Sequence, residues 1–166
     1  MKHLRVQPEG EKYFRITGID PVLLDCLHSL PETLEQRNSP AVRDRLFPNI
    51  TTSDDDANRD WQQLVAPELH HLFATAGETV VRDLTAMQPD PDVADLLHLT
   101  FTAEHLQAWI TALNQARLIL GEVFSVTDTD MNNTAFDLKT PKDLAVFRIH
   151  VLGYLLQLLV DQAGRA

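Results

Sequence analysis

Two arginines, Arg117 and Arg148, lie where a helical pattern places apolar side chains. At 100° per residue, Arg117 falls between Leu113 and Leu120, in the middle of an apolar stripe. Arg148 lies in the same way within the aliphatic stretch from 144 to 160. A guanidinium in such a stripe must bind a carboxylate or reach solvent, because an unpaired buried charge costs several kcal/mol.

Position alone leaves two explanations of these arginines open. Each arginine could form an internal ion pair, cap a carbonyl or extend to solvent. Alternatively, Arg117 or Arg148 could hold an anionic ligand, since a guanidinium binds carboxylates and phosphates through two parallel hydrogen bonds. Asn114 lies at the edge of the stripe that contains Arg117. We therefore take Arg117, Arg148 and Asn114 as candidate ligand-binding residues.

Seven histidines raise the question of a metal site, but their spacing does not support one. Glu68 and His71 form one isolated Glu-x-x-His, whereas di-iron bundles need two such motifs and two further glutamates. The loop that begins at Asp128 resembles a calcium-binding EF-hand loop over five positions. In that loop Asn133 replaces the required glycine and Lys139 replaces the bidentate glutamate. We expect no metal and no cofactor.

Catalytic motifs are also missing from the sequence. The single cysteine, Cys26, lies within an apolar helical pattern, where an inert core thiol is the common outcome. No Gly-x-Ser-x-Gly, Ser-x-x-Lys or phosphate-binding glycine loop is present. The pattern therefore favours a protein that is not an enzyme.

The elements that must position these residues begin with a β-hairpin and capped helices. Alternating apolar residues on both sides of a turn at 8–11 predict a hairpin within residues 1–19. Asp20 followed by Pro21 predicts the N-terminus of a helix. Thr140 followed by Pro141 predicts the start of the last helix in the same way.

The middle of the chain predicts two long helices separated by irregular stretches. Apolar spacing predicts a helix that begins near the acidic run 54–56 and is kinked or broken at Pro67. It predicts a second, amphipathic helix from Thr102 to about Phe124, in which Gly121 is a candidate C-terminus. Three stretches remain: 38–52 and 125–139 are expected to be irregular, and 96–101 is either a strand or an extended entry to the helix.

Together these elements predict a mainly α (α+β) fold. We expect a single domain over residues 1–166, with the β-hairpin at 1–19 and a helical body at 20–166. The last helix is so apolar that its own domain or a partner subunit must bury it on most sides. We therefore expect a central, largely buried C-terminal helix, and self-association into a homo-oligomer stays open. The few residues outside its apolar face are Val146, His150, Gly153 and Gln157.

Charge and composition exclude several partners. The chain of 166 residues has 14 Lys and Arg against 24 Asp and Glu, a net charge of −10, which opposes binding to nucleic acid or anionic lipid. The apolar stretch 144–160 is shorter than the roughly 20 residues that span a bilayer and contains Arg148. A lone cysteine and a charged N-terminus without an apolar segment favour the cytoplasm.

Two segments in combination resemble a known family. Arg45-Leu46-Phe47-Pro48 precedes an acidic run and a long helix, and the segment 108–121 is followed by Val126-Thr127. Their order and spacing are similar to those of an uncharacterised bacterial family, best known from actinobacteria and defined only as a domain of unknown function. The resemblance covers the chain from the opening hairpin to the last helix, which is more aliphatic here than in the actinobacterial members.

The resemblance implies no activity, cofactor or catalytic residue, because the family has none established. Its genes often lie beside that of ClpS, the adaptor that feeds substrates to the Clp protease. This neighbourhood implies a link to regulated proteolysis.

Two functions therefore remain open. The first is a non-enzymatic protein-interaction or adaptor domain with an unknown protein partner. The second is a small-molecule binding protein or enzyme that holds an anionic ligand with Arg117 or Arg148. An arginine that points into a pocket without an internal acid partner favours the second function, and carboxylate bridges at both arginines exclude it.

Overall fold

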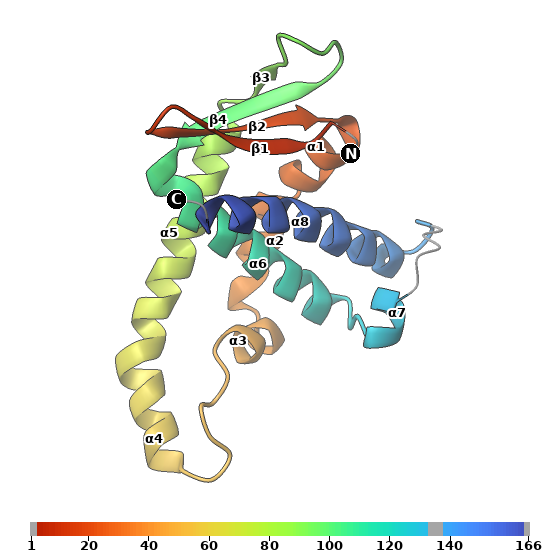
Figure 1. Cartoon of the computed structure of the whole chain (residues 1–166). Coiled ribbons are helices and arrows are strands. Elements are labelled where there is room, and N and C mark those ends of the chain that lie inside the picture. The colour runs from red at the N-terminus through yellow and green to blue at the C-terminus, as the bar shows by residue number, and fades with distance from the viewer. Residues whose placement is uncertain (1–2, 133–137, 165–166) are drawn as a thin grey trace.

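A small antiparallel sheet lies at one end of the molecule, over a body of helices (Figure 1). The computed structural model describes residues 3–132 and 138–164. The sheet has the strand order β1-β2-β4-β3, formed by β1 (Arg5–Glu9), β2 (Tyr13–Ile19), β4 (Leu97–Thr102) and β3 (Gln88–Pro89). The hairpin of β1 and β2 confirms the prediction for the N-terminus. The run at 96–101, left open between strand and extended chain, forms β4 and pairs with β2.

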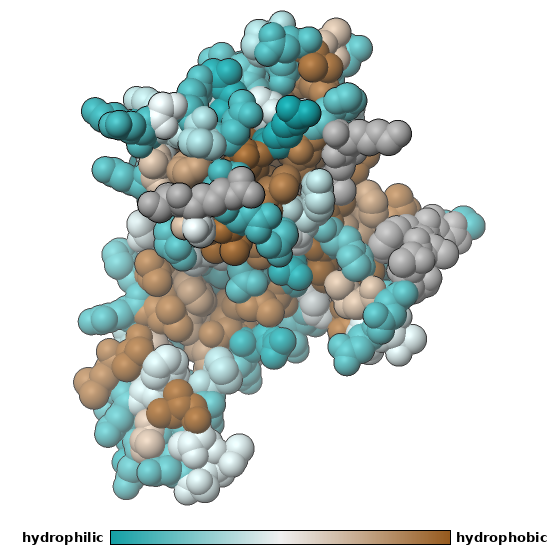
Figure 2. Space-filling view, viewed as in Figure 1, coloured by the Kyte–Doolittle hydropathy of each residue, from teal (hydrophilic) through white to brown (hydrophobic). Residues whose placement is uncertain are grey.

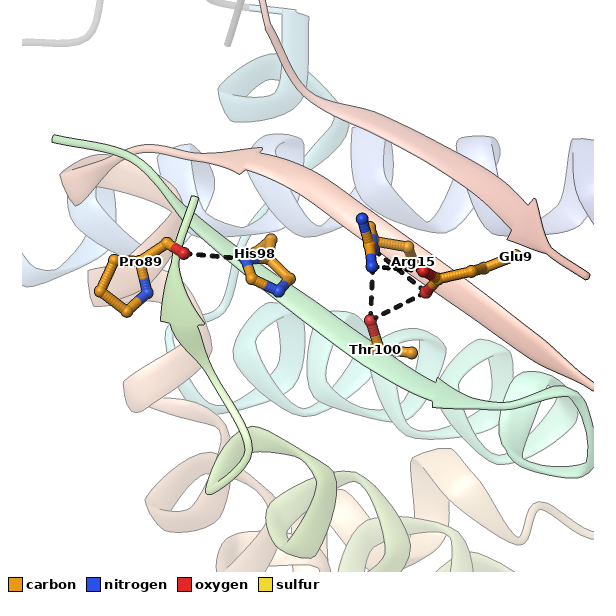
Figure 3. Close-up of polar contacts among 5 residues, drawn as sticks. All are labelled: Glu9, Arg15, Pro89, His98 and Thr100. Atoms are coloured by element: carbon orange, nitrogen blue, oxygen red, sulfur yellow. Dashed lines mark hydrogen bonds and ion pairs between the residues drawn. The ribbon is translucent and has the colours of Figure 1, made fainter. Parts of the chain in front are cut away.

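The two faces of the sheet differ in chemistry. The inner face is buried and packs on the helices through aromatic rings, with Phe101 stacked 5.3 Å from Trp109. The outer face is polar (Figure 3): the Arg15 guanidinium pairs with Glu9, and Thr100 Oγ1 donates to Glu9 Oε2 at 3.2 Å. This alternation is the pattern of a sheet with one face on the core and the other in water.

His98 extends this polar face toward the sheet edge. Its Nδ1 lies 3.0 Å from the carbonyl oxygen of Pro89 on the edge strand β3 (Figure 3). Proline cannot donate a backbone hydrogen bond, so a sheet tolerates it on an edge strand.

Capping residues set the helices of the first half. Asp20 Oδ1 accepts from the backbone N–H of Leu23 at 2.9 Å and begins α1 (Pro21–His28), as predicted. The helices α2 (Leu30–Glu35), η1 (Gln36–Asn38) and α3 (Pro40–Leu46) follow. The expectation of an irregular stretch at 38–52 is wrong for α3, a helix with proline in its first turn and Val42 and Leu46 in the core. Such a short helix gains its stability from that packing rather than from its sequence pattern.

The helical segment from α4 to α5 contains a distortion beside Pro67. Asp54 caps α4 (Asp55–Asp60), which continues into the π-helical turn η2 (Trp61–Val65) and then α5 (Ala66–Leu84). Proline lacks an N–H, and its ring clashes with the carbonyl one turn earlier. The wider π turn accommodates that clash, so the predicted kink takes the form of a π segment rather than a break. The end of this segment that contains α4 stands away from the sheet (Figure 1).

The two central helices, α6 and α8, pack side by side beneath the sheet (Figure 1). The turn η3 (Ala103–His105) leads into α6 (Leu106–Val123). This helix ends close to Phe124, as its apolar spacing predicts, and the alternative end at Gly121 is wrong. The helix instead ends before Ser125, whose φ of 48° leaves the helical region. Within 125–139 the structure adds a short helix, α7 (Asp128–Asn132).

The last helix, α8 (Pro141–Ala163), is capped by Thr140 as predicted and packs against α6, α1 and β1. Its burial is one-sided, because Tyr154 and Val160 each lie 44% exposed. Val146, placed outside the apolar face by its helical angle, is buried. By length and composition α8 could also cross a membrane, and 39% of its most apolar window is buried within the described chain. The mainly α (α+β) fold class is confirmed.

Cys26 lies in the core on α1 and is expected to be chemically inert. Burial raises the pKa of its thiol to about 11, although the nearby charge of Arg148 acts in the opposite direction. We expect a disulfide reagent at about pH 8 to modify the native protein at least about 1,000-fold more slowly than the urea-unfolded chain, because reaction requires opening of the core. Equal rates in the two states would contradict this position of Cys26.

Candidate functional site

The Arg117 side chain extends from the middle of α6 toward α8 and lies against the backbone of Gly153. A Cβ atom at Gly153 would lie 3.2 Å from Arg117 Nε and 3.4 Å from its Cζ. Glycine within a helix costs about 0.5–1 kcal/mol relative to alanine. Here it allows the guanidinium to approach the helix backbone.

Two adjoining cavities meet at Arg117, with volumes of about 330 and about 400 Å³. Both are lined by Arg117, Met131 and Ile149. We call the two cavities together the Arg117 cleft. The smaller cavity also contains Arg45 and Glu122, and the larger one runs along the exposed side of α8 past Gly153 and Tyr154.

No carboxylate neutralises Arg117 within residues 3–132 and 138–164. Its Nε is buried without a hydrogen-bond partner, and no ion pair of its guanidinium is formed there. Glu122 lines the smaller cavity together with Arg117 but makes no hydrogen bond or ion pair with the Arg117 guanidinium. The Nη atoms do not share the burial of Nε, so they remain open to the cleft.

Arg148 also has a buried Nε without a hydrogen-bond partner, but it differs from Arg117 in having an acid partner. Its Nη2 donates to Asp25 Oδ2 at 3.1 Å, which joins α8 to α1. The guanidinium is half-buried and Asp25 is exposed, so this ion pair contributes at most about 1 kcal/mol. Arg148 and Arg117 therefore do not form one site, and Asn114 is exposed on α6 outside the lining of the Arg117 cleft.

Several residues of the cleft have no role in the sequence prediction. Arg45 comes from α3, which was expected to be irregular, and Met131 comes from α7, which was expected to be a loop. Gly153 is the residue that sequence could have flagged, since a glycine inside an aliphatic helix indicates a close approach to its backbone.

An ion pair holds Met131 over the cleft. Lys142 Nζ on α8 lies 2.6 Å from Asp130 Oδ2 on α7, and Asp130 also accepts from the Thr127 backbone N–H at 2.8 Å. The Lys142 ammonium and these hydrogen bonds lower the pKa of Asp130 to about 2. At any pH above this pKa, the ion pair therefore ties α7, the helix that carries Met131, to the first turn of α8.

A second polar cluster joins the end of α5 to the start of α6. Trp109 Nε1 donates to Asp83 Oδ2 at 2.9 Å, and His105 Nδ1 lies 3.0 Å from both carboxylate oxygens. His105 also lines a cavity of about 270 Å³ together with Thr79 and Thr111. Among the described residues no threonine hydroxyl is hydrogen-bonded to His105, so no nucleophile is paired with this histidine. We assign the cluster to packing of the Trp109 ring.

His70 on α5 stacks on Phe47 with ring centroids 3.7 Å apart, and its Nε2 is buried without a partner. Burial lowers the pKa of His70 from its ordinary 6.5, and the charges of Arg43 and Arg37 lower it further.

Because the unfolded chain then binds a proton that the native chain does not, the free energy of unfolding should fall as the pH drops below about 6.5. Urea titrations at about pH 7.5 and about pH 5.5 measure how much the free energy of unfolding changes between these two pH values. This change should be smaller for His70→Gln than for wild type. His71→Gln, at the exposed neighbour, is the control and should leave the difference unchanged.

The described chain assembles no metal site: within it no group of three or more His, Cys, Asp or Glu is placed to hold an ion. Of the segment that resembles an EF-hand loop, 128–132 forms α7, and Asn133 lies outside the described residues. Glu68 and the exposed His71 lie on α5 without a third ligand among these residues.

The fold is a mainly helical α+β domain. An antiparallel sheet with a polar outer face covers the central helices α6 and α8, and the Arg117 cleft is lined by residues of both helices. The chain belongs to the family described as domain of unknown function DUF2017, whose model matches residues 6–163. This match confirms the expectation of an uncharacterised family that covers the chain from the hairpin to the last helix. Searches of curated proteins and of solved structures found no match.

Proposed function

We propose that this chain is a non-enzymatic binding domain for an anionic ligand and that Arg117 binds the negative charge. The carrying observation is that Arg117 enters a cleft without an acid partner among the described residues, whereas Arg148 pairs with Asp25. A half-buried guanidinium without a carboxylate gains more from an anion than one that is already paired. The absence of a paired nucleophile and base in the described chain supports a binding role rather than catalysis.

The test is a nitrogen-15 NMR titration of the whole chain with acetate, isocaproate and phosphate. Binding at the cleft should shift the amide signals near Arg117 and Gly153 and leave those near His98, in the sheet, in place. Arg117→Gln should abolish these shifts, and Arg148→Gln should retain them. If none of the anions shifts the signals around Arg117, the proposal is wrong.

The second candidate is a protein-interaction or adaptor domain that associates with a second copy of itself. Its support is a set of uncovered aliphatic side chains on the arm formed by η2 and the start of α5, where Leu64 is 70% and Leu72 is 55% exposed. Apolar groups are visible on this arm in Figure 2. Apolar side chains clustered on a protruding element favour contact with another protein.

Sedimentation velocity over a wide concentration range tests this candidate. The wild-type chain should change from monomer to dimer with rising concentration, and the double variant Leu64→Asp with Leu72→Asp should remain a monomer. Gln63→Asp, at an exposed polar position of the same turn, adds a negative charge without removing an apolar side chain; it is the control and should dimerise like wild type. A wild-type chain that is monomeric throughout excludes self-association through the arm.

The cellular setting is also part of the proposal. The protein is proposed to be cytoplasmic and to bind neither nucleic acid nor membrane. The net charge of −10 supports the second part and the single buried cysteine the first. The resemblance to a bacterial family encoded beside ClpS supports a link of the adaptor candidate to regulated proteolysis. The check is whether the domain changes the rate at which the Clp protease degrades a ClpS-delivered substrate.

A further inference from the structure

The charge that lines the Arg117 cleft suits an anion of single charge. Arg117 and Arg45 contribute two guanidinium groups, and Glu122 contributes one carboxylate to the cavity that holds Arg45. Counted over the described residues, with histidine neutral, the lining has a net charge of +1. A monoanion balances this charge, whereas a phosphate dianion would add repulsion against Glu122.

The hydrogen-bond donors of the cleft suit a flat anion with two oxygens. Phosphate sites often use the free backbone N–H groups of a helix N-terminus. Arg117 and Gly153 lie in the middle of α6 and α8, where backbone N–H groups are bonded within the helix. The charged donors are then the guanidinium groups, whose planar fork matches a carboxylate, and His150, Tyr154 and Gln157 add neutral polar groups to the larger cavity.

The same cleft offers aliphatic contacts on both sides of Arg117. Met131 and Ile149 line both cavities, Leu118 lines the smaller one and Leu156 the larger one. Each cavity is at the lower end of the range of about 300–1,000 Å³ that small-molecule sites occupy. A ligand that satisfies both the charge and these side chains is an acid with a small aliphatic body.

We infer that the Arg117 cleft binds a monocarboxylate carried on a short aliphatic group. The carboxylate lies on the Arg117 guanidinium, and the aliphatic group contacts Met131 and Ile149. This inference rests on the proposed anion-binding role of the cleft and narrows it to one ligand class. A free short-chain acid and the C-terminal residue of a peptide that ends in leucine share this chemistry.

Calorimetry and the NMR titration with isocaproate and its uncharged amide test the ligand class. Isocaproate should bind at least about tenfold more tightly than isocaproamide, because loss of one charged hydrogen-bonding group costs roughly that factor or more. Acetate should bind more weakly than isocaproate, since it lacks the aliphatic body. An acetylated alanyl-alanyl-leucine acid and its C-terminal amide distinguish the two sources of the carboxylate.

Three variants test the geometry. Arg117→Gln should lower the affinity for isocaproate at least about tenfold. Gly153→Ala should also weaken binding, because its Cβ would displace the guanidinium, while the midpoint of urea unfolding stays the same or rises. Arg148→Gln changes a side chain that pairs with Asp25 and is not among the residues that line the cleft, so it should bind isocaproate like wild type.

The outcomes separate this inference from the proposal on which it rests. Two results would keep the proposal of an anion site but overturn the inference of an aliphatic monocarboxylate. One is that phosphate shifts the signals around Arg117 as strongly as isocaproate does, and the other is that isocaproate and acetate bind with equal affinity. The inference would also be overturned by Gly153→Ala binding isocaproate with wild-type affinity. No shift with any anion would reject both. If the peptide acid binds more tightly than isocaproate, the carboxylate comes from the C-terminus of a peptide. If isocaproate binds more tightly, the ligand is a free acid.

Discussion

Replacing Asp83 with alanine is expected to lower the free energy of unfolding by about 3 kcal/mol. Asp83 is only 10% exposed at its side chain and accepts the hydrogen bond of the fully buried Trp109 indole. Without it the indole N–H stays buried and unpaired, which costs about 1–3 kcal/mol, and the contact with His105 is lost as well. The corresponding fall in melting temperature is about 6–12 °C for a chain of this size.

Two further variants isolate the role of the Asp83 carboxylate. Asp83→Asn retains an oxygen that can accept from Trp109 and should cost about 1 kcal/mol. Glu78→Ala removes an exposed acid from the same helix and should change stability by no more than about 0.5 kcal/mol. An Asp83→Ala loss no larger than that of Glu78→Ala would show that the cluster does not stabilise the junction of α5 and α6.

Replacing Gly18 with alanine is expected to cost about 3 kcal/mol or more. Gly18 has a φ of 73°, and a Cβ there would lie 2.2 Å from the carbonyl oxygen of His3 and 2.8 Å from the Leu4 nitrogen. These are backbone atoms, so relief requires a movement of the chain that enters β1. The position lies where the pairing of β2 with β4 shifts its register between Ile16 and Ile19.

Gly10 supplies the matched control for Gly18. Its φ of 67° is nearly the same, but a Cβ there would meet no atom within 4 Å. Gly10→Ala should therefore show only the cost of the left-handed backbone, about 1–2 kcal/mol. Urea unfolding of both variants measures the difference, and equal losses would show that the close approach of His3 contributes nothing.

Local signals in the sequence were sufficient for much of the fold. The caps at Asp20 and Thr140 and the hairpin before residue 19 depend on neighbours a few residues apart, and the structure confirms them. The missed helix α3 and the run 96–101, which the sequence left open, depend on contacts between distant residues. The helix α3 is held by core packing, and β4 becomes a strand because β2 offers it a free edge.

The Asp83 cluster and the Arg117 cleft follow the same division. Asp83 carried no motif in the sequence, because its role arises from Trp109, 26 residues later in the chain. Arg45 and Met131 reach the Arg117 cleft from short helices that periodicity did not predict. Gly153 alone had a local signal, since glycine weakens a helix unless a close approach needs it.

By itself, the sequence determined that two guanidinium groups lie within the apolar stripes of two helices, since helical periodicity depends only on residue spacing. Only the tertiary structure decided which of them is neutralised. Asp25, 123 positions before Arg148, reaches it through the packing of α1 on α8, whereas Arg117 faces Gly153 and a cleft without a carboxylate partner in the described chain. Ion pairing acts over a few ångströms in space, and no local pattern states which distant residues come that close.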